Sequence, residues 1–133
     1  MQLGLESVVH FTGFRRDLER VVAALDVVVN CSYEVESLSG AVTIAMAMGK
    51  PVIATAIAGT PELVEEGITG CLVPPRDAEA LARAIRKTAA LSAEQRREMG
   101  FQARRKMESD FSREARARRM EELYLEILRQ KRV

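Results

Sequence analysis

Short apolar runs alternate with longer segments of helical periodicity along most of this chain. Four runs have the length and composition of strands; they span residues 8–14, 26–30, 51–55 and 70–74. Between them, apolar residues recur at three- and four-residue spacing, which is typical of helices with one buried face. Strands that alternate with helices predict a parallel sheet with right-handed crossovers. We therefore expect an α/β fold, with a Rossmann-like parallel sheet of about four strands and flanking helices.

Polar and glycine residues predict where several of these helices begin and end. Short polar side chains can accept hydrogen bonds from the free amides at a helix N-terminus. Such residues open the predicted helices at Asp17, Thr60, Asp77, Ser92 and Ser112. Gln95 stands three residues after Ser92, which matches the capping-box pattern. A helix over residues 40–48 should end at Gly49, because glycine readily adopts the left-handed conformation that follows a helix.

These patterns divide the chain into an α/β core over residues 1–92 and helices over residues 93–133. The last helix has an apolar stripe at helical spacing, made of Met120, Leu123, Tyr124, Ile127 and Leu128. The chain opens almost directly on a predicted strand, without a preceding strand–helix unit. Doubly wound sheets usually have more strands on that side, so we expect a single partial domain cut from a larger one.

Composition excludes some functions. Hydrophobic residues make up 47% of the 133 residues, enough for a buried core, and the net charge is only +1. So small a charge gives no reason to expect nucleic-acid binding. Cys31 and Cys71 lie in or beside apolar runs and are expected to be buried free thiols. Without a signal peptide or a membrane-spanning apolar stretch, the sequence favours a cytoplasmic protein; membrane contact is open but not indicated.

Candidate chemistry gathers in loops that follow the predicted strands. Ligands of open parallel sheets bind beyond the carboxyl ends of the strands. Three predicted loops lie there, at residues 13–16, 31–40 and 55–60. In the middle loop, Ser37, Ser39 and Gly40 lead into a helix whose N-terminal amides suit a phosphate. Glu36 could accept hydrogen bonds from a neighbouring polyol; alternatively, a serine only caps the helix and Glu36 is solvated.

A family resemblance is strongest in residues 31–64, which read CSYEVESLSGAVTIAMAMGKPVIATAIAGTPELV. This segment resembles the signature stretch of the GT-B glycosyltransferases grouped as family four. That family places a Ser, a Glu and a glycine-rich turn before a helix ending in Ala-Met-Ala-x-Gly, followed by Pro-Val-Ile-Ala and Gly-x-Pro-Glu-Leu. The matching residues are Ser32, Glu36, Ala45, Met46, Ala47, Gly49, Pro51, Val52, Ile53, Ala54, Gly59, Pro61, Glu62, Leu63 and Gly70. The flanking segments are similar too, so the resemblance covers nearly the whole chain.

The resemblance implies the C-terminal, donor-binding half of a GT-B fold in a retaining glycosyltransferase. Such an enzyme transfers a sugar from a nucleotide-diphosphate donor to an acceptor. It uses neither a metal nor a cofactor, because positive charge and helix dipoles stabilise the leaving diphosphate. The acceptor site belongs to the family's N-terminal domain, which we expect this chain to lack. The chain alone is therefore expected to be inactive, with that domain as its partner.

Matched residue by residue, the resemblance gives roles to two segments. Glu36 corresponds to the first of two family glutamates and would face the donor sugar as the catalytic residue. The turn whose amides approach the sugar and diphosphate corresponds to Ser37, Leu38, Ser39 and Gly40. Phe14 and Arg15 follow the first predicted strand, where the family places the nucleotide base. The alternative for Arg15 is a plain surface charge.

One position departs from the family. The second glutamate, which holds the ribose hydroxyls, corresponds to Ile44, whose side chain cannot accept a hydrogen bond. Two functions therefore stay open. The chain is either the donor-binding part of an active transferase, or a non-catalytic interaction or assembly module that kept the fold and lost donor binding.

The incomplete sheet also predicts self-association. An unpaired strand edge presents free backbone groups that seek a partner, so we expect a homo-oligomer through the exposed sheet edge. The apolar stripe of the last helix, with Met120, Tyr124 and Leu128, would add to that contact. In the family, this helix reaches back toward the other domain.

Overall fold

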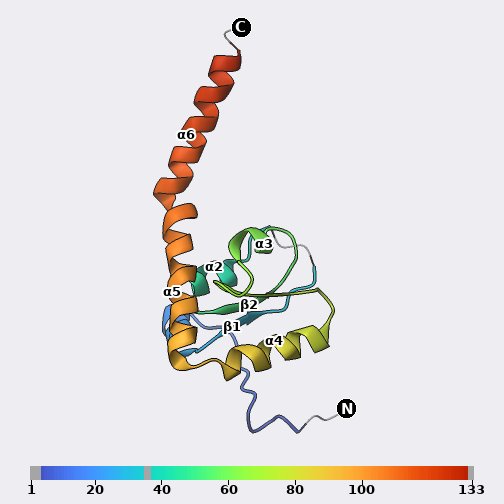
Figure 1. The fold of residues 1–133 in the computed structure, drawn as a ribbon. Coiled ribbons are helices and arrows are strands. Elements are labelled where there is room, and N and C mark those ends of the chain that lie inside the picture. The colour runs from blue at the N-terminus through green and yellow to red at the C-terminus, as the bar shows by residue number, and fades with distance from the viewer. Residues whose placement is uncertain (1–3, 35–36, 132–133) are drawn as a thin grey trace.

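The computed structural model describes residues 4–34 and 37–131, and it shows a parallel sheet with helices on both faces (Figure 1). The elements in chain order are α1 (Leu18–Ala24), β1 (Val28–Asn30), α2 (Gly40–Ala47), β2 (Val52–Thr55), α3 (Thr60–Leu63), β3 (Gly70–Val73), α4 (Ala78–Ala90), α5 (Ala93–Asp110) and α6 (Arg113–Gln130). The strands lie in the order β1-β2-β3, and both pairs are parallel. The predicted α/β, Rossmann-like class is confirmed.

The core forms on both sides of β2 because successive side chains of a strand point to opposite faces. Val52 and Ala54 pack with α2 and α5, where Met46 and Met107 are buried. Ile53 packs on the other face, in the cluster that includes Ala84 of α4. Figure 1 shows α4 on one side of the sheet and α2 on the other. As the strand in the middle, β2 is buried along its whole length.

The predicted strand at residues 8–14 is wrong. The segment forms no strand, and the sheet has three strands rather than about four. Phe11 is 97% exposed and Phe14 is 89% exposed. A β-branched and aromatic run becomes a strand only where a neighbouring strand satisfies its backbone groups. Among the described residues, the sheet pairs only β1, β2 and β3, so residues 8–14 gain no such neighbour.

Two predictions about burial are also wrong. The continuous β-branched run at residues 26–30 predicts a strand that is buried on both faces, but Val29 is exposed because β1 is an edge strand. Cys31 is exposed, whereas Cys71 is buried as expected. Both errors have one cause. A continuous apolar run is typical of a strand in the middle of a sheet, whereas β1 lies at the edge and has an open side.

Most predicted helix ends are confirmed by hydrogen bonds. Asp77 and Ser112 accept backbone amide protons at the starts of α4 and α6, and Ser92 and Gln95 form the full capping box. Gly49 follows α2 with a positive φ of 68°. Thr60 differs, since it is the first residue of α3 and Gly59 precedes it as the N-cap. Asp17 lies at the N-cap of α1, but its side chain makes no capping hydrogen bond and pairs with Arg15 instead.

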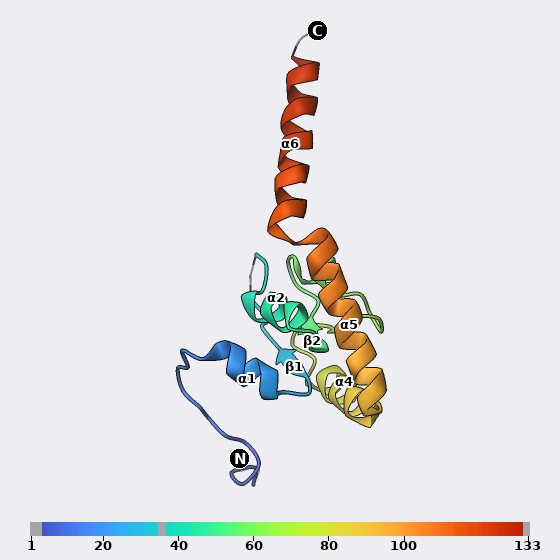
Figure 2. The same cartoon turned by 90° about the vertical axis from the view of Figure 1, so that its left-hand side faces the viewer.

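α6 projects away from the rest of the molecule in both views (Figures 1 and 2). Ala115 is its one buried residue among those that the structure describes. The predicted apolar stripe is therefore exposed. None of the described helices has the length and apolar character needed to cross a membrane.

Replacing Gly100 with alanine should destabilise the fold, although alanine normally favours a helix. Gly100 lies in α5 where that helix meets the end of α2; a Cβ there would overlap the Gly49 carbonyl oxygen and lie 2.7 Å from its carbon. We expect the free energy of unfolding to fall by about 1–3 kcal/mol, the usual cost of overpacking. Denaturant unfolding measures it. Gly40→Ala is the matched control, because a Cβ at Gly40 meets nothing within 4 Å. A Gly100→Ala protein as stable as the parent would contradict this packing.

Candidate functional site

The carboxyl edge of the sheet brings two loops together, one after β1 and one after β2. The Gly59 amide donates a hydrogen bond to the Ser37 carbonyl oxygen at 3.1 Å. The Thr55 hydroxyl, at the end of β2, donates to the Ser32 carbonyl oxygen. A Cβ on Gly59 would lie 2.5 Å from the Ser37 oxygen and 2.8 Å from Cδ1 of Leu38. Only glycine allows so close an approach of the two loops.

Asn30, the last residue of β1, ties the two ends of the first loop together. Its Nδ2 donates to Oγ of Ser39 at 2.7 Å, and its Oδ1 accepts from the Ser32 amide at 3.0 Å. Asn30 was not among the site residues predicted from the sequence. One feature of the sequence could have indicated Asn30: it is an amide residue that ends an apolar run and comes directly before a polar loop. Its two partners could not be found from the sequence, because they depend on how the loop folds back.

Ser39 caps α2 and is almost fully buried. Its Oγ accepts the Val42 amide proton at 3.5 Å, and its carbonyl oxygen accepts from Oγ1 of Thr43 at 2.9 Å. The capping role considered from the sequence is therefore present. Capping by Ser39 accounts for the third amide of the helix, so the amides of Gly40 and Ala41 are left for another acceptor. α2 has no acidic residue in its first turn, and the space beside Gly40 is open.

These features give α2 an N-terminus that can hold an anion. The aligned peptide dipoles place a partial positive charge there, and free amides point outward. Ser37 and Leu38 are exposed immediately before it. The structure thus brings Ser37, Leu38, Ser39 and Gly40 together in one turn at the carboxyl edge of the sheet. Glu36, the predicted catalytic residue, lies outside the described residues.

Ile44 lies on α2, one turn after the start of the helix. It is half-buried and belongs to neither of the two buried clusters. Its neighbours Ala45 and Met46 point into the core instead. The position is therefore partly accessible from solvent, and a longer polar side chain there would not be enclosed in the core.

Phe14 and Arg15 lie just before α1, and the hydrogen bonds of Arg15 go to Asp17 rather than to the turn before α2. Arg15 donates from Nε and Nη2 to the two carboxylate oxygens of Asp17, at 2.8 and 2.6 Å. This pairing holds the pKa of Asp17 below its usual value. No hydrogen bond described in the structure joins Arg15 to residues 37–40, so its predicted role at a nucleotide base stays a prediction.

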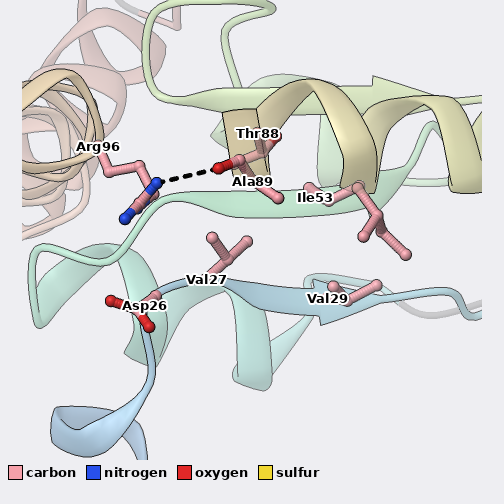
Figure 3. A pocket seen from close by; sticks show the side chains of 8 residues that line it. Asp26, Val27, Val29, Ile53, Thr88, Ala89 and Arg96 are labelled. Atoms are coloured by element: carbon pink, nitrogen blue, oxygen red, sulfur yellow. Dashed lines mark hydrogen bonds between the residues drawn. The ribbon is translucent and has the colours of Figure 1, made fainter. Parts of the chain in front are cut away.

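An apolar groove of about 460 Å³ lies elsewhere, between the sheet and α4 (Figure 3). Val27, Val29 and Ile53 line one side, and Thr88 and Ala89 of α4 lie opposite. Arg96 closes one end and donates to the Ala89 carbonyl oxygen at 3.3 Å. None of the predicted site residues lines this groove. Its apolar walls do not suit a diphosphate, and in the described part of the chain no cluster of three His, Cys, Asp or Glu side chains could hold a metal ion.

Comparison with known proteins agrees with the resemblance in the sequence. The family model described as glycosyl transferases group 1 matches residues 1–90. The putative colanic acid biosynthesis glycosyltransferase WcaL of Escherichia coli K12 is 37% identical over 119 residues, which cover 84% of this chain and 29% of WcaL. The chain thus spans less than a third of that relative's length.

Two solved structures have the same fold over most of the chain. A glycosyltransferase from Rickettsia africae superimposes with a TM-score of 0.76 and 32% identity, covering 86% of this chain and 30% of its own. HepE from Anabaena, solved with UDP-glucose, superimposes with a TM-score of 0.72 and 35% identity, covering 77% of this chain and 28% of its own.

Proposed function

We propose, since this chain belongs to the glycosyl transferases group 1 family, that it supplies the donor side of a sugar-transfer site. The donor is a nucleoside diphosphate sugar, the class of ligand in the HepE complex. The observation that supports this most is the N-terminus of α2. Its turn lies at the carboxyl edge of the sheet, has no acidic side chain in the first turn of the helix and opens to solvent beside Gly40.

The proposed chemistry uses this turn to stabilise a leaving group. As the bond between the anomeric carbon and the diphosphate oxygen breaks, negative charge grows on the diphosphate. Amides of Gly40 and Ala41 and the dipole of α2 would stabilise that charge in the transition state. Hydrogen bonds from Asn30 and Gly59 hold the turn in place beforehand, so little reorganisation is needed. By family analogy, Glu36 faces the donor sugar, and Phe14 and Arg15 approach the base.

The acceptor side of the site is proposed to come from another part of a longer protein. The chain covers only about 30% of the WcaL relatives, so most of their length has no counterpart here. Catalysis requires both reactants in one geometry, and this contributes a large share of the rate enhancement. The chain by itself is therefore expected to bind donor but not to transfer its sugar.

Ile44 favours the second candidate function, a non-catalytic module that kept the fold. Its side chain offers no acceptor to the ribose hydroxyls where the family has a carboxylate. Titrating the chain with UDP, GDP and ADP by calorimetry separates the two. The donor-site proposal requires saturable binding of at least one nucleotide. Absence of binding by all three, in a protein that shows a normal melt, would favour the module.

Asn30 offers a test of the turn itself. Asn30→Ala removes both hydrogen bonds, so we expect the free energy of unfolding to fall by about 1–2 kcal/mol, near 1 kcal/mol for each bond. Asn30→Asp keeps an acceptor for the Ser32 amide but adds a negative charge beside the proposed diphosphate. It should therefore weaken nucleotide binding more than Asn30→Ala does. Unfolding curves and nucleotide titrations on both variants measure this. Equal binding by the parent and Asn30→Asp would argue against an anion at this turn.

A further inference from the structure

The open side of α2 has an apolar residue at its centre. The residues of this helix that are buried in the core are Val42, Ala45 and Met46. Gly40, Ile44 and Ala47 are spaced four and three residues apart, so they share the opposite side. Gly40 and Ala47 are exposed, and Ile44 is half-buried. A helix usually presents charged or polar residues on its open side, and α2 presents none at these positions.

Ile44 lies over the turn that is proposed to hold the diphosphate. Side chains of a helix lean toward its N-terminus and cover the turn that precedes their own Cα. Ile44 therefore extends over Gly40 and Ala41, whose amides are the proposed partners of the diphosphate. Isoleucine is branched at Cβ and strongly prefers one rotamer in a helix, so its side chain does not readily swing aside. A group attached to the diphosphate on this side meets an apolar surface.

The group that meets Ile44 is the pentose of the nucleotide. The diphosphate of a sugar nucleotide has two substituents, the transferred sugar and the pentose. The transferred sugar must stay open to an acceptor, so it lies beyond the carboxyl edge of the sheet. Ile44, in contrast, lies one turn back along α2. The pentose is therefore the substituent that lies beside the helix.

A pentose at this position finds few acceptors on α2. The helix is described in full, and its one polar side chain is Thr43, whose hydroxyl donates to the Ser39 carbonyl oxygen at 2.9 Å. Leu38, which is exposed just before the helix, is apolar. A 2′ hydroxyl placed against Ile44 would lose its hydrogen bonds to water without replacement. A 2′ methylene group has no such bonds to lose.

We propose that this site accepts 2′-deoxyribonucleoside diphosphate sugars and does not select for a 2′ hydroxyl. Ile44 is the residue that sets this specificity. The inference rests on the proposed donor site and names the class of nucleotide that the site takes. It also gives Ile44 a place in an active transferase, because an apolar side chain suits a pentose that has no hydroxyl to bind at that carbon.

A carboxylate from another element would reverse this specificity. Glu34 is exposed in the loop between β1 and α2, and it is the nearest described carboxylate before the helix in the sequence. Asp17, before α1, is already paired with Arg15. If Glu34 reached the pentose, the chain would prefer the ribonucleotide, and Glu34→Gln would reduce that preference.

Paired nucleotides that differ only at the 2′ carbon test the inference. Each of UDP, GDP and ADP would be titrated into the full chain by calorimetry, beside its 2′-deoxy form. For any pair that binds, we expect dissociation constants within about twofold of each other. A ribonucleotide that binds at least about tenfold tighter than its deoxy form would overturn the inference and leave the donor site standing. If none of the six binds, the donor-site proposal fails, and the inference fails with it.

Substitutions on α2 show whether Ile44 sets the specificity. Ile44→Glu adds an acceptor for the 2′ hydroxyl, so it should favour the ribonucleotide over its deoxy form by about tenfold, the effect of one hydrogen bond. Ile44→Gln adds a neutral acceptor and keeps the test valid if the charge lowers the melting temperature. Ala47→Gln, the matched control, adds the same amide farther along the open side and should keep the parent ratio. If the Ile44 variants fold normally and bind without preference, Ile44 does not face the pentose and the inference is overturned.

Discussion

Replacing Ile44 with glutamate should tighten binding of a nucleoside diphosphate about ten- to a hundredfold. A hydrogen bond to a charged group contributes about 1.5–3 kcal/mol, which corresponds to that factor in affinity. Ile44 is half-buried outside both core clusters, so a carboxylate there can keep contact with water. The melting temperature should therefore change little. Calorimetric titration and a melting curve on the same variant measure both quantities.

Ile44→Leu is the matched control, since it keeps an apolar side chain of equal volume and should leave nucleotide affinity unchanged. A different result would change the interpretation of the whole chain. If Ile44→Glu lowers the melting temperature and binds no nucleotide, the position does not face a ribose. The non-catalytic module would then be the better account.

Replacing Gly59 with alanine should abolish most nucleotide binding. The added Cβ would lie 2.5 Å from the Ser37 carbonyl oxygen and 2.8 Å from Cδ1 of Leu38, so the two loops must move apart. Separation breaks the hydrogen bond from the Gly59 amide to Ser37 and displaces the turn before α2. We expect affinity to fall at least tenfold and the free energy of unfolding to fall by about 1–3 kcal/mol.

Gly67→Ala provides a comparison for the Gly59 variant. A Cβ at Gly67 meets no atom within 4 Å, although φ there is +76°, so the cost is backbone strain away from the turn. It should lower stability and leave nucleotide affinity unaltered. If both glycine variants lost stability alike and kept affinity, the turn after β1 would not be part of the binding site.

The sequence predicted the parts of this fold that depend on local pattern. The helix caps at Asp77, Ser92 and Ser112 could be predicted because each capping hydrogen bond spans only three residues. The buried run of β2 was recognisable because β2 lies in the middle of the sheet. Residues 8–14 have an equally apolar composition, yet form no strand. Composition alone cannot show whether a neighbouring strand is present to accept the backbone hydrogen bonds.

The residues of the candidate site could be predicted from the sequence, but the hydrogen bonds that hold them in place could not. The turn at Ser37, Ser39 and Gly40 followed from the motif and from its place after a strand. The hydrogen bonds that position it come from Asn30, 9 residues before Ser39, and from Gly59, 22 residues after Ser37, and they depend on the packing of two loops. Gly59 was matched as part of the family motif, and the reason for glycine there is the approach to Ser37.

Backbone amide shifts give the most direct test of the central claim that the N-terminus of α2 holds a nucleoside diphosphate. Nitrogen-15 spectra of the full chain would be recorded while UDP, or whichever nucleoside diphosphate binds in calorimetry, is added. The account predicts the largest saturable changes at the amides of Gly40 and Ala41, with smaller ones at Gly59. Changes centred on Val27, Val29 and Ala89, which line the groove beneath α4, or no saturable change anywhere, would contradict it.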